Sequence, residues 1–366
     1  MILNLIFLLC FSTSALAFDQ ALPGYRYDFP KDHFAHPTFK TEWWYYTGNL
    51  ATPQGRRFGF ELTFFRQAQR ERTAGQSVWE IDDIYLAHLA LSDIHGQRFF
   101  KDERLNRGGP GLAGARLEDA RIWNGNWQVR WTDVTDPLGA QQLQAFSADF
   151  ALELTLSPRK GPVIHGVDGV SQKASGAGQA SHYVSFTRLD VAGLLTLRNE
   201  KHSVNGTAWM DHEFFTHSLD PDQAGWDWAS IQLENNAELM LYRLRRNDGT
   251  ADPHSAGSYI DGRGRPRHLS ATEIQMQPQG DVWLSSKTGA RYPLRWSISV
   301  PSLGIELLCT TPFREQEVVS QRGTSPNYWE GAVDFTGRID GKPIRGIGYL
   351  EMTGYDRPVN LGDAGP

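Results

Sequence analysis

Cysteine is nearly absent from this chain of 366 residues, which contains only Cys10 and Cys309. Cys10 lies in an N-terminal segment that we expect to be removed, so Cys309 would remain alone and no intramolecular disulfide could form. Hydrophobic burial must then supply the stability. The 12 Trp, 12 Tyr and 19 Phe residues offer large side-chain areas for this purpose.

Runs of basic residues are also absent, and the formal net charge is −6. Nucleic acids and anionic membrane surfaces attract clustered positive charge. We therefore expect neither of them to be a partner of this protein.

Long apolar runs are absent apart from one at the N terminus. It extends from Ile2 to Phe11 and leads to Ala15-Leu16-Ala17, whose small residues are typical of a signal-peptide cleavage site. The run is too short to serve as a membrane-spanning anchor. We predict that residues 1–17 are a cleaved signal peptide, and that the mature protein is periplasmic or secreted and not an integral membrane protein.

Helical periodicity is rare, and strand patterns recur instead. From Phe58 to Phe64 every even position is apolar, and the segment from Val204 to Asp211 alternates in a similar way. Turn sequences such as Asn247-Asp248-Gly249 and Asp340-Gly341 separate the strand-like segments. Many short strands with frequent turns predict an all-β fold made of barrels or sandwiches.

An internal repeat suggests two similar domains. Glu61-Leu-Thr-Phe-Phe-Arg66 reappears as Glu238-Leu-Met-Leu-Tyr-Arg243, and each copy follows a Trp-rich segment. We therefore predict an N-terminal domain at residues 18–215 and a C-terminal domain at residues 216–366. Residues 161–180 are rich in Gly, Ser and Ala, which predicts a long loop with a functional or mobile role.

Several motifs resemble one known group of proteins, the family of carotenoid 1,2-hydratases and AttH-like secreted proteins. The motifs are Glu42-Trp-Trp-Tyr-Tyr-Thr-Gly48, Gly206-Thr-Ala-Trp-Met-Asp-His-Glu213, Gly225-Trp-Asp-Trp228, Tyr328-Trp-Glu-Gly331 and Gly348-Tyr-Leu-Glu-Met-Thr-Gly-Tyr355. The resemblance implies two lipocalin-like antiparallel β-barrel domains packed together. It also implies a precedent in hydration of an isoprenoid carbon–carbon double bond, without a metal or an organic cofactor. The scaffold alone does not fix the chemistry.

Two residues of the hydratase pattern have counterparts in this chain. The resemblance implies that Asp211 matches its essential Asp and that His182 matches its His. Trp209 stands where the hydratases have Tyr, and Val184 stands where they have a second Trp, so the aromatic surroundings of the acid differ from those of the hydratases. The substrate contacts that we predict around these two residues are Trp209, Tyr183, Val184, Trp43, Trp44 and Glu213.

Hydration of an unactivated alkene requires a general acid that keeps its proton near neutral pH. Burial in an apolar barrel would raise the pKa of Asp211 above the usual value of about 3.9. His182 would orient the acid or hold the water, and a Trp face would stabilise a cation by roughly 0.5–2 kcal/mol. The alternative is a structural Asp211, bonded to backbone or to an Arg inside the barrel.

Three other functions are open to this sequence. Asp211, His212, Glu213 and His217 suggest a metal, but no second cluster with ligand spacing accompanies them, so we predict no metal. A Ser-based hydrolase lacks its Gly-x-Ser-x-Gly turn. A carrier that encloses a hydrophobic ligand in an aromatic-lined barrel is the main rival. The prediction is a hydratase-like protein acting on, or binding, an isoprenoid or lipid-like molecule.

Overall fold

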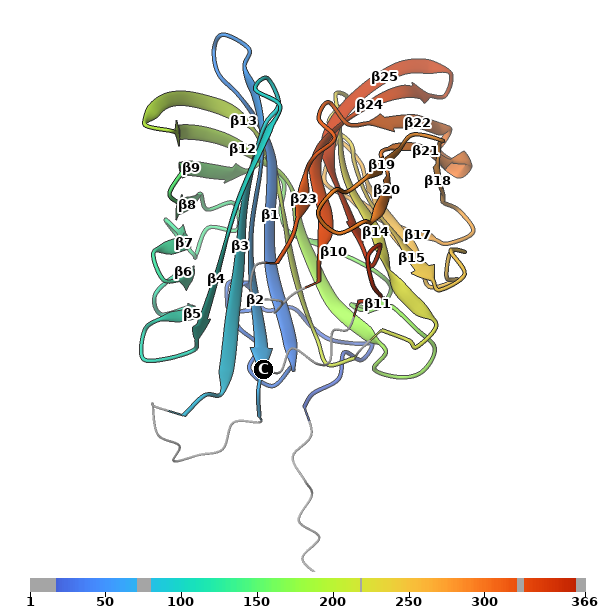
Figure 1. The fold of residues 1–366 in the computed structure, drawn as a ribbon. Coiled ribbons are helices and arrows are strands. Elements are labelled where there is room, and N and C mark those ends of the chain that lie inside the picture. The colour runs from blue at the N-terminus through green and yellow to red at the C-terminus, as the bar shows by residue number, and fades with distance from the viewer. Residues whose placement is uncertain (1–17, 71–79, 218, 321–325, 360–366) are drawn as a thin grey trace, which may run out of the picture.

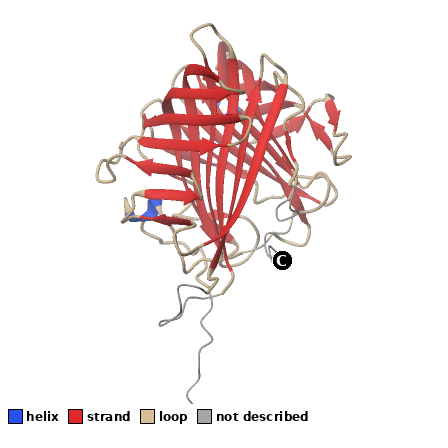
Figure 2. Cartoon of the chain, turned by 60° about the vertical axis from the view of Figure 1, so that its left-hand side comes forward, coloured by secondary structure: helices blue, strands red, loops and turns tan. Residues whose placement is uncertain are grey.

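The computed structural model describes residues 18–70, 80–217, 219–320 and 326–359 (Figure 1). Strands dominate this part of the chain (Figure 2). Its helical elements are two short 3-10 helices. The expected signal peptide, residues 1–17, lies outside the described residues. No helix in the described ranges has the length and the apolar character needed to cross a membrane.

The strands form two large, strongly curved antiparallel sheets that stand side by side (Figure 1). The first sheet has the order β4-β3-β2-β1-β13-β12-β9-β8-β7-β6-β5, with β10 and β11 paired to β12. Its elements, with the preceding 3-10 helix, are η1 (Lys31–His33), β1 (Thr41–Ala51), β2 (Arg57–Ala68), β3 (Asp83–Asp93), β4 (Arg98–Arg107), β5 (Ala113–Arg116), β6 (Arg121–Asn124), β7 (Trp127–Trp131), β8 (Gln141–Phe146), β9 (Phe150–Pro158), β10 (Val163–Ile164), β11 (Ser171–Gln172), β12 (Ala180–Leu197) and β13 (Glu200–Phe215).

The second sheet has the order β17-β16-β15-β14-β25-β24-β22-β21-β18, with β23 paired to β24, and a small hairpin of β19 and β20 lies beside it. Its elements are β14 (Gln223–Leu233), β15 (Glu238–Arg246), β16 (Ala256–Ile260), β17 (Pro266–Ser270), β18 (Gln275–Pro278), β19 (Val282–Leu284), β20 (Arg291–Pro293), β21 (Arg295–Val300), η2 (Pro301–Leu303), β22 (Ile305–Thr310), β23 (Glu317–Val318), β24 (Tyr328–Ile339) and β25 (Lys342–Thr353). The predicted all-β fold of two packed lipocalin-like sheets is confirmed.

The repeated Glu-Leu-x-x-x-Arg segments occupy corresponding strands. The first copy lies in β2, which pairs with β1 and β3, and the second lies in β15, which pairs with β14 and β16. Each copy is therefore the second strand of its sheet in chain order.

Side-chain alternation divides the first sheet into an inner and an outer face. Successive strand residues face opposite sides. In β1, β2 and β13 the even-numbered residues face inward, toward the core. The inner face is packed with large apolar side chains. Examples are Trp44, Tyr46, Phe60, Phe64, Trp127 and Met210. The second sheet has its own core, which includes Trp296, Trp329 and the free thiol of Cys309.

The outer faces of the two sheets pack against each other. A third apolar cluster lies between them and takes Tyr45, Tyr183 and Trp209 from the first sheet and Trp228 and Tyr349 from the second. Polar bonds cross the same boundary. They include Tyr45 to Glu330, Asn49 to Gly348, Arg57 to Asp334, Lys160 to Glu238 and Arg188 to Glu238.

Candidate functional site

Asp211 lies in β13 on the outer face of the first sheet and is 3% exposed. Its Oδ1 accepts hydrogen bonds from the Trp209 indole at 2.6 Å and from the Ser185 hydroxyl, and its Oδ2 accepts one from the Tyr183 hydroxyl at 2.6 Å. Ser185 is the cross-strand partner of Asp211 on β12, and Trp209 is two residues away on its own strand. The strand geometry therefore surrounds the carboxyl with uncharged donors.

A second layer of residues holds these donors in place. The Trp228 indole, from the second sheet, donates to the Tyr183 oxygen at 2.9 Å. His165 bridges the sheets, with Nε2 at 2.7 Å from the Ser185 oxygen and Nδ1 at 2.9 Å from the Ser258 oxygen. The surroundings of Asp211 thus depend on both sheets.

Burial raises the pKa of Asp211 to about 7, although the hydrogen bonds from Ser185, Tyr183 and Trp209 oppose the shift. Within the described residues Asp211 forms no ion pair, so the structural alternative in which an Arg neutralises it does not hold there. The neighbouring cation, Lys173, pairs with Glu213 at 3.1 Å.

Three further carboxyl groups lie on the same boundary. Glu330 and Glu351 are cross-strand partners on β24 and β25, and Glu61 lies on β2. Burial raises the pKa of Glu330 well above its usual value, and the charges of Glu61 and Glu351 add to this shift. Burial raises the pKa of Glu61 to about 7 and that of Glu351 to about 8.

Neutral donors contact these glutamates. Tyr45 donates to Glu330 at 2.7 Å, and the Trp226 indole donates to Glu351 at 3.0 Å. Oε2 of Glu330 is buried and has no hydrogen-bond partner among the residues that the structure describes. Oε2 of Glu61 is in the same situation. Unpartnered buried carboxyl oxygens are rare in proteins, and each one requires an explanation.

Tyr45 links the two groups of carboxyls. It is the cross-strand neighbour of Asp211 on β1, while its hydroxyl reaches Glu330 in the second sheet. Its ring meets the ring of Trp228 edge-on, with centroids 5.2 Å apart. We define the interdomain site as Asp211, Glu330, Glu61 and Glu351 with the aromatic residues Tyr45, Tyr183, Trp209, Trp226 and Trp228.

The structure brings part of the predicted site together. Asp211, Trp209, Tyr183 and Glu213 share the outer face, and Trp43 packs at the edge of the same apolar cluster. The carboxyl therefore faces the second sheet, and not a barrel interior as the sequence analysis expected.

Three predicted site residues lie elsewhere, on the opposite face. The register places His182 beside Phe214 and Val184 beside His212, one residue out of phase with Tyr183 and Ser185. His182 bonds the carbonyl of Gly169 at 2.9 Å. Trp44 belongs to the core of the first sheet. The predicted pairing of His182 with Asp211 was wrong, because the register of β12 and β13 places the two side chains on opposite faces of the sheet.

Sequence reasoning missed the His that is linked to Asp211 through the Ser185 hydroxyl. His165 comes from the Gly-rich segment predicted as a loop, and β10 and β11 of that segment pair with β12. Glu330 and Glu351 stood inside family-like motifs, and Glu61 stood inside the repeat, yet no spacing connected them with Asp211. Only the packing of two sheets joins residues so far apart in the chain.

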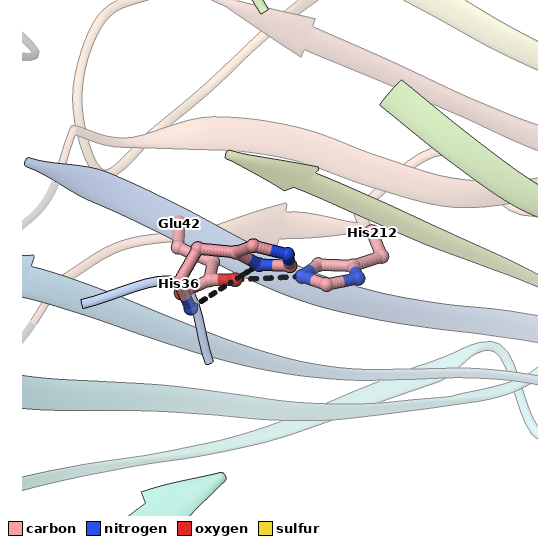
Figure 3. A group of neighbouring side chains, drawn as sticks. All are labelled: His36, Glu42 and His212. Carbon is pink, nitrogen blue, oxygen red and sulfur yellow. Dashed lines mark hydrogen bonds and ion pairs between the residues drawn. The ribbon is translucent and has the colours of Figure 1, made fainter. Parts of the chain in front are cut away.

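A second polar cluster lies on the face of the first sheet opposite Asp211, where His36, Glu42 and His212 meet (Figure 3). His36 Nδ1 and His212 Nε2 lie 2.7 and 2.8 Å from the same Glu42 oxygen. The other oxygen of Glu42 accepts a hydrogen bond from Arg66 at 2.9 Å. Although burial opposes it, the charges of His36 and Arg66 hold the pKa of Glu42 well below its usual value.

This cluster also has the donors of a metal site, since one ligand atom from each of the three residues lies within 4.8 Å of the others. The sequence had suggested a metal at Asp211, His212, Glu213 and His217. The structure does not bring that set together, because His212 faces away from Asp211 and Glu213.

The hydrogen bonds of the second polar cluster form a charged network. Through them Glu42, on β1, is joined to His36 of the N-terminal segment, Arg66 of β2 and His212 of β13. His212 Nδ1 is its one buried ring nitrogen without a partner.

Known proteins of similar sequence include two fungal enzymes. The dehydratase asqC of Emericella nidulans is 21% identical over 222 residues, which are 59% of this chain and 62% of that protein. The kievitone hydratase of Fusarium solani subsp. phaseoli is 22% identical over 145 residues, which are 39% of each chain. The match thus spans less than two thirds of either relative.

One solved structure resembles the chain over nearly its whole length. The AttH candidate of Nitrosomonas europaea has a TM-score of 0.80 and 33% sequence identity, covering 92% of this chain and 99% of that one. The AttH-like family model matches residues 20–355. A match from near Phe18 to the last strand, on a fold with the same two curved sheets, confirms the resemblance read from the motifs: the chain belongs to the AttH-like family.

Proposed function

We propose that this protein is a hydro-lyase of the hydratase type, which adds water to or removes water from a hydrophobic small molecule of the isoprenoid or lipid-like class. The reaction takes place at the interdomain site and uses protein carboxyls, without a metal or an organic cofactor. The names of the two fungal relatives support this reaction class, because hydration and dehydration are opposite directions of one reaction.

The main support for the proposal is the environment of Asp211. The carboxyl is almost completely buried, its partners are neutral donors, and burial raises its pKa to about 7. A carboxyl of this kind exchanges its proton near neutral pH, as general acid–base catalysis requires. The indoles of Trp209 and Trp228 are suited to stabilising a carbocation.

A carrier without turnover is the alternative. It would hold its ligand inside a barrel, and the interior of the first sheet is instead packed with side chains such as Trp44, Tyr46 and Trp127. This packing argues against a ligand held inside the first barrel.

We also propose the domain division and the location inferred from the sequence. Strand β13 ends at Phe215 and β14 begins at Gln223, which supports a division into residues 18–215 and 216–366. Periplasmic or secreted location depends on removal of residues 1–17. N-terminal sequencing of the native protein should begin at Phe18, and a full-length chain in the cytoplasm would refute this location.

Asp211→Asn provides the test of the proposed reaction. Wild-type protein is incubated with a panel of unsaturated terpenoids and lipids in water labelled with ¹⁸O, and the products are examined by mass spectrometry. We expect a labelled hydroxyl in at least one product, with the rate lowered roughly 10²–10⁴-fold by Asp211→Asn. The exposed Asp149→Asn is the matched control and should leave the rate unchanged. Ligand binding without incorporation of label would support the carrier.

A further inference from the structure

The hydrogen bonds around the interdomain carboxyls allow their roles to be separated. We propose that Glu330 gives its proton to the substrate carbon during hydration, and that Asp211 is the base that receives a proton from the attacking water. This inference rests on the proposed function and reverses the role of general acid that the sequence assigned to Asp211.

The donors around Asp211 favour its ionised form. The Trp209 indole nitrogen can only donate, and its proton points to Oδ1. The Tyr183 oxygen already accepts the proton of the Trp228 indole, so its own proton is directed to Oδ2. Both oxygens of Asp211 thus receive a proton from a neighbour, which is the pattern of a carboxylate that accepts and does not donate.

A chain of hydrogen bonds from the second sheet supports the same direction. Ser258 donates to His165 Nδ1, His165 Nε2–H donates to Ser185, and Ser185 donates to Asp211 Oδ1. The direction requires the Nε2–H tautomer of a neutral His165. Burial lowers the pKa of His165 to about 3, so this imidazole remains neutral.

Glu330 has the opposite arrangement. Its side chain is fully buried, Tyr45 is its one donor among the described residues, and Oε2 has no partner. Its cross-strand neighbour is another carboxyl, Glu351, and within the described residues no Lys or Arg pairs with Glu330. A bare buried carboxylate oxygen is costly, whereas a protonated oxygen removes the charge and has a proton to give.

Glu61 is the other carboxyl with an unpartnered oxygen, but its position fits the role less well. Its Oε1 accepts two hydrogen bonds, from Thr63 at 2.7 Å and from Tyr328 at 2.9 Å. Two donors stabilise its ionised form more than the single donor stabilises that of Glu330. Only Glu330 is joined by a hydrogen bond to Tyr45, the cross-strand neighbour of Asp211.

The proposed hydration takes place in two steps. The Glu330 O–H bond breaks as a new C–H bond forms at one alkene carbon, leaving a tertiary carbocation and a Glu330 carboxylate. Water adds to the cation through a new C–O bond, and Asp211 takes the proton that water loses. The net change is addition of one water, and transfer of a proton from Asp211 back to Glu330 through solvent restores the starting state. In dehydration the two groups exchange roles.

The first test measures the protonation states without any substrate. A protonated carboxylic acid has a C=O stretching band in the infrared that a carboxylate lacks. We expect the difference spectrum between wild type and Glu330→Gln at pH 7.5 to show the loss of such a band, and that between wild type and Asp211→Asn to show the loss of carboxylate bands. Loss of the acid band in Asp211→Asn, with none in Glu330→Gln, would overturn the assignment. The exposed Glu306→Gln controls for the substitution itself.

The second test uses the sign of the pH dependence. If Asp211 is the base, kcat/KM for hydration falls as the pH drops below about 7, because a protonated Asp211 cannot accept a proton. If Asp211 were the acid, kcat/KM would fall above about pH 7 instead. Glu330→Gln should lower turnover roughly 10²–10⁴-fold, and unchanged turnover would contradict the role of Glu330. Failure of the wild type either to hydrate or to dehydrate any compound would refute the proposed function, while the infrared result would still decide which carboxyl holds the proton.

Discussion

Glu42 and Glu330 are both fully buried, but their neighbours differ in charge. Glu42 accepts bonds from Arg66, His36 and His212, so its negative charge is compensated. Glu330 has Tyr45 as its donor and Glu351 as its cross-strand partner. Because a buried charge is tolerated only when it is paired or accepts several hydrogen bonds, the first carboxyl is stable as an ion and the second, with one donor, as an acid. The first therefore has a structural role, and the second is available for chemistry.

Replacement of Glu42 tests the structural role. Glu42→Gln leaves Arg66 without one of its two carboxylate partners, and we expect a loss of about 3–5 kcal/mol in the free energy of unfolding, measured with urea. The exposed Glu200→Gln should change it by less than about 0.5 kcal/mol. Equal stability of the two variants would contradict the role of the network.

The effect of Glu42→Gln should also depend on pH. The pKa of Glu42 is lowered on folding, so its contribution is complete above its unfolded value of 4.5 and is lost as the pH falls. Although burial opposes it, Glu42 and Asp32 raise the pKa of His36, so that contribution is complete below 6.5 and is lost as the pH rises through the folded value. The difference between wild type and variant should therefore be largest between pH 4.5 and 6.5.

The sequence predicted part of the candidate site. Trp209 and Glu213 were expected near Asp211 and lie on the same face of β13, because alternate residues of one strand point to the same side. The error with His182 has a different origin. Which residues of two paired strands share a face depends on the register of the pairing. The register of β12 and β13 places Ser185, and not His182, opposite Asp211.

At the scale of elements, the close approach of β14 and β25 depends on a missing side chain. A Cβ at Gly348 would lie 1.8 Å from the backbone oxygen of Ser230. Gly348→Ala should therefore force the two strands apart and lower the free energy of unfolding by about 1–3 kcal/mol or more. Gly161→Ala, where a Cβ meets no atom within 4 Å, is the matched control. If both variants unfold at the same urea concentration, the packing described for this pair of strands is incorrect.

The strands themselves were largely predictable. Segments with clear alternation, such as Phe58–Phe64 in β2, became long regular strands because one face is buried in the core. The Gly-rich residues 161–180 contain β10 and β11 and insert His165 and Lys173 at the boundary between the sheets. Short strands of this kind lack enough residues to show a period, so the sequence indicated only a long segment with a role of its own.

At the scale of the whole molecule, the two sheets form one polar and aromatic interface. Gly59 on β2 lies at this boundary, and a Cβ there would lie 2.8 Å both from Ala332 Cβ and from the Tyr349 hydroxyl of the second sheet. We expect Gly59→Ala to separate the sheets locally and to cost about 1–3 kcal/mol, measured by thermal unfolding. Adding Tyr349→Phe removes one of the two close contacts, so the double variant should lose less than the sum of the single changes. Strict additivity would contradict the contact.

We expect the ligand to bind between the two sheets, in contact with the interdomain carboxyls. A crystal structure of the protein with an unsaturated terpenoid that it hydrates, or with the hydroxylated product, would locate the ligand. We predict density for the ligand between β13 and β24, with the reacting carbons next to Glu330 and the new hydroxyl within hydrogen-bond distance of Asp211. Density inside the first barrel, among Trp44, Tyr46 and Trp127, would contradict it.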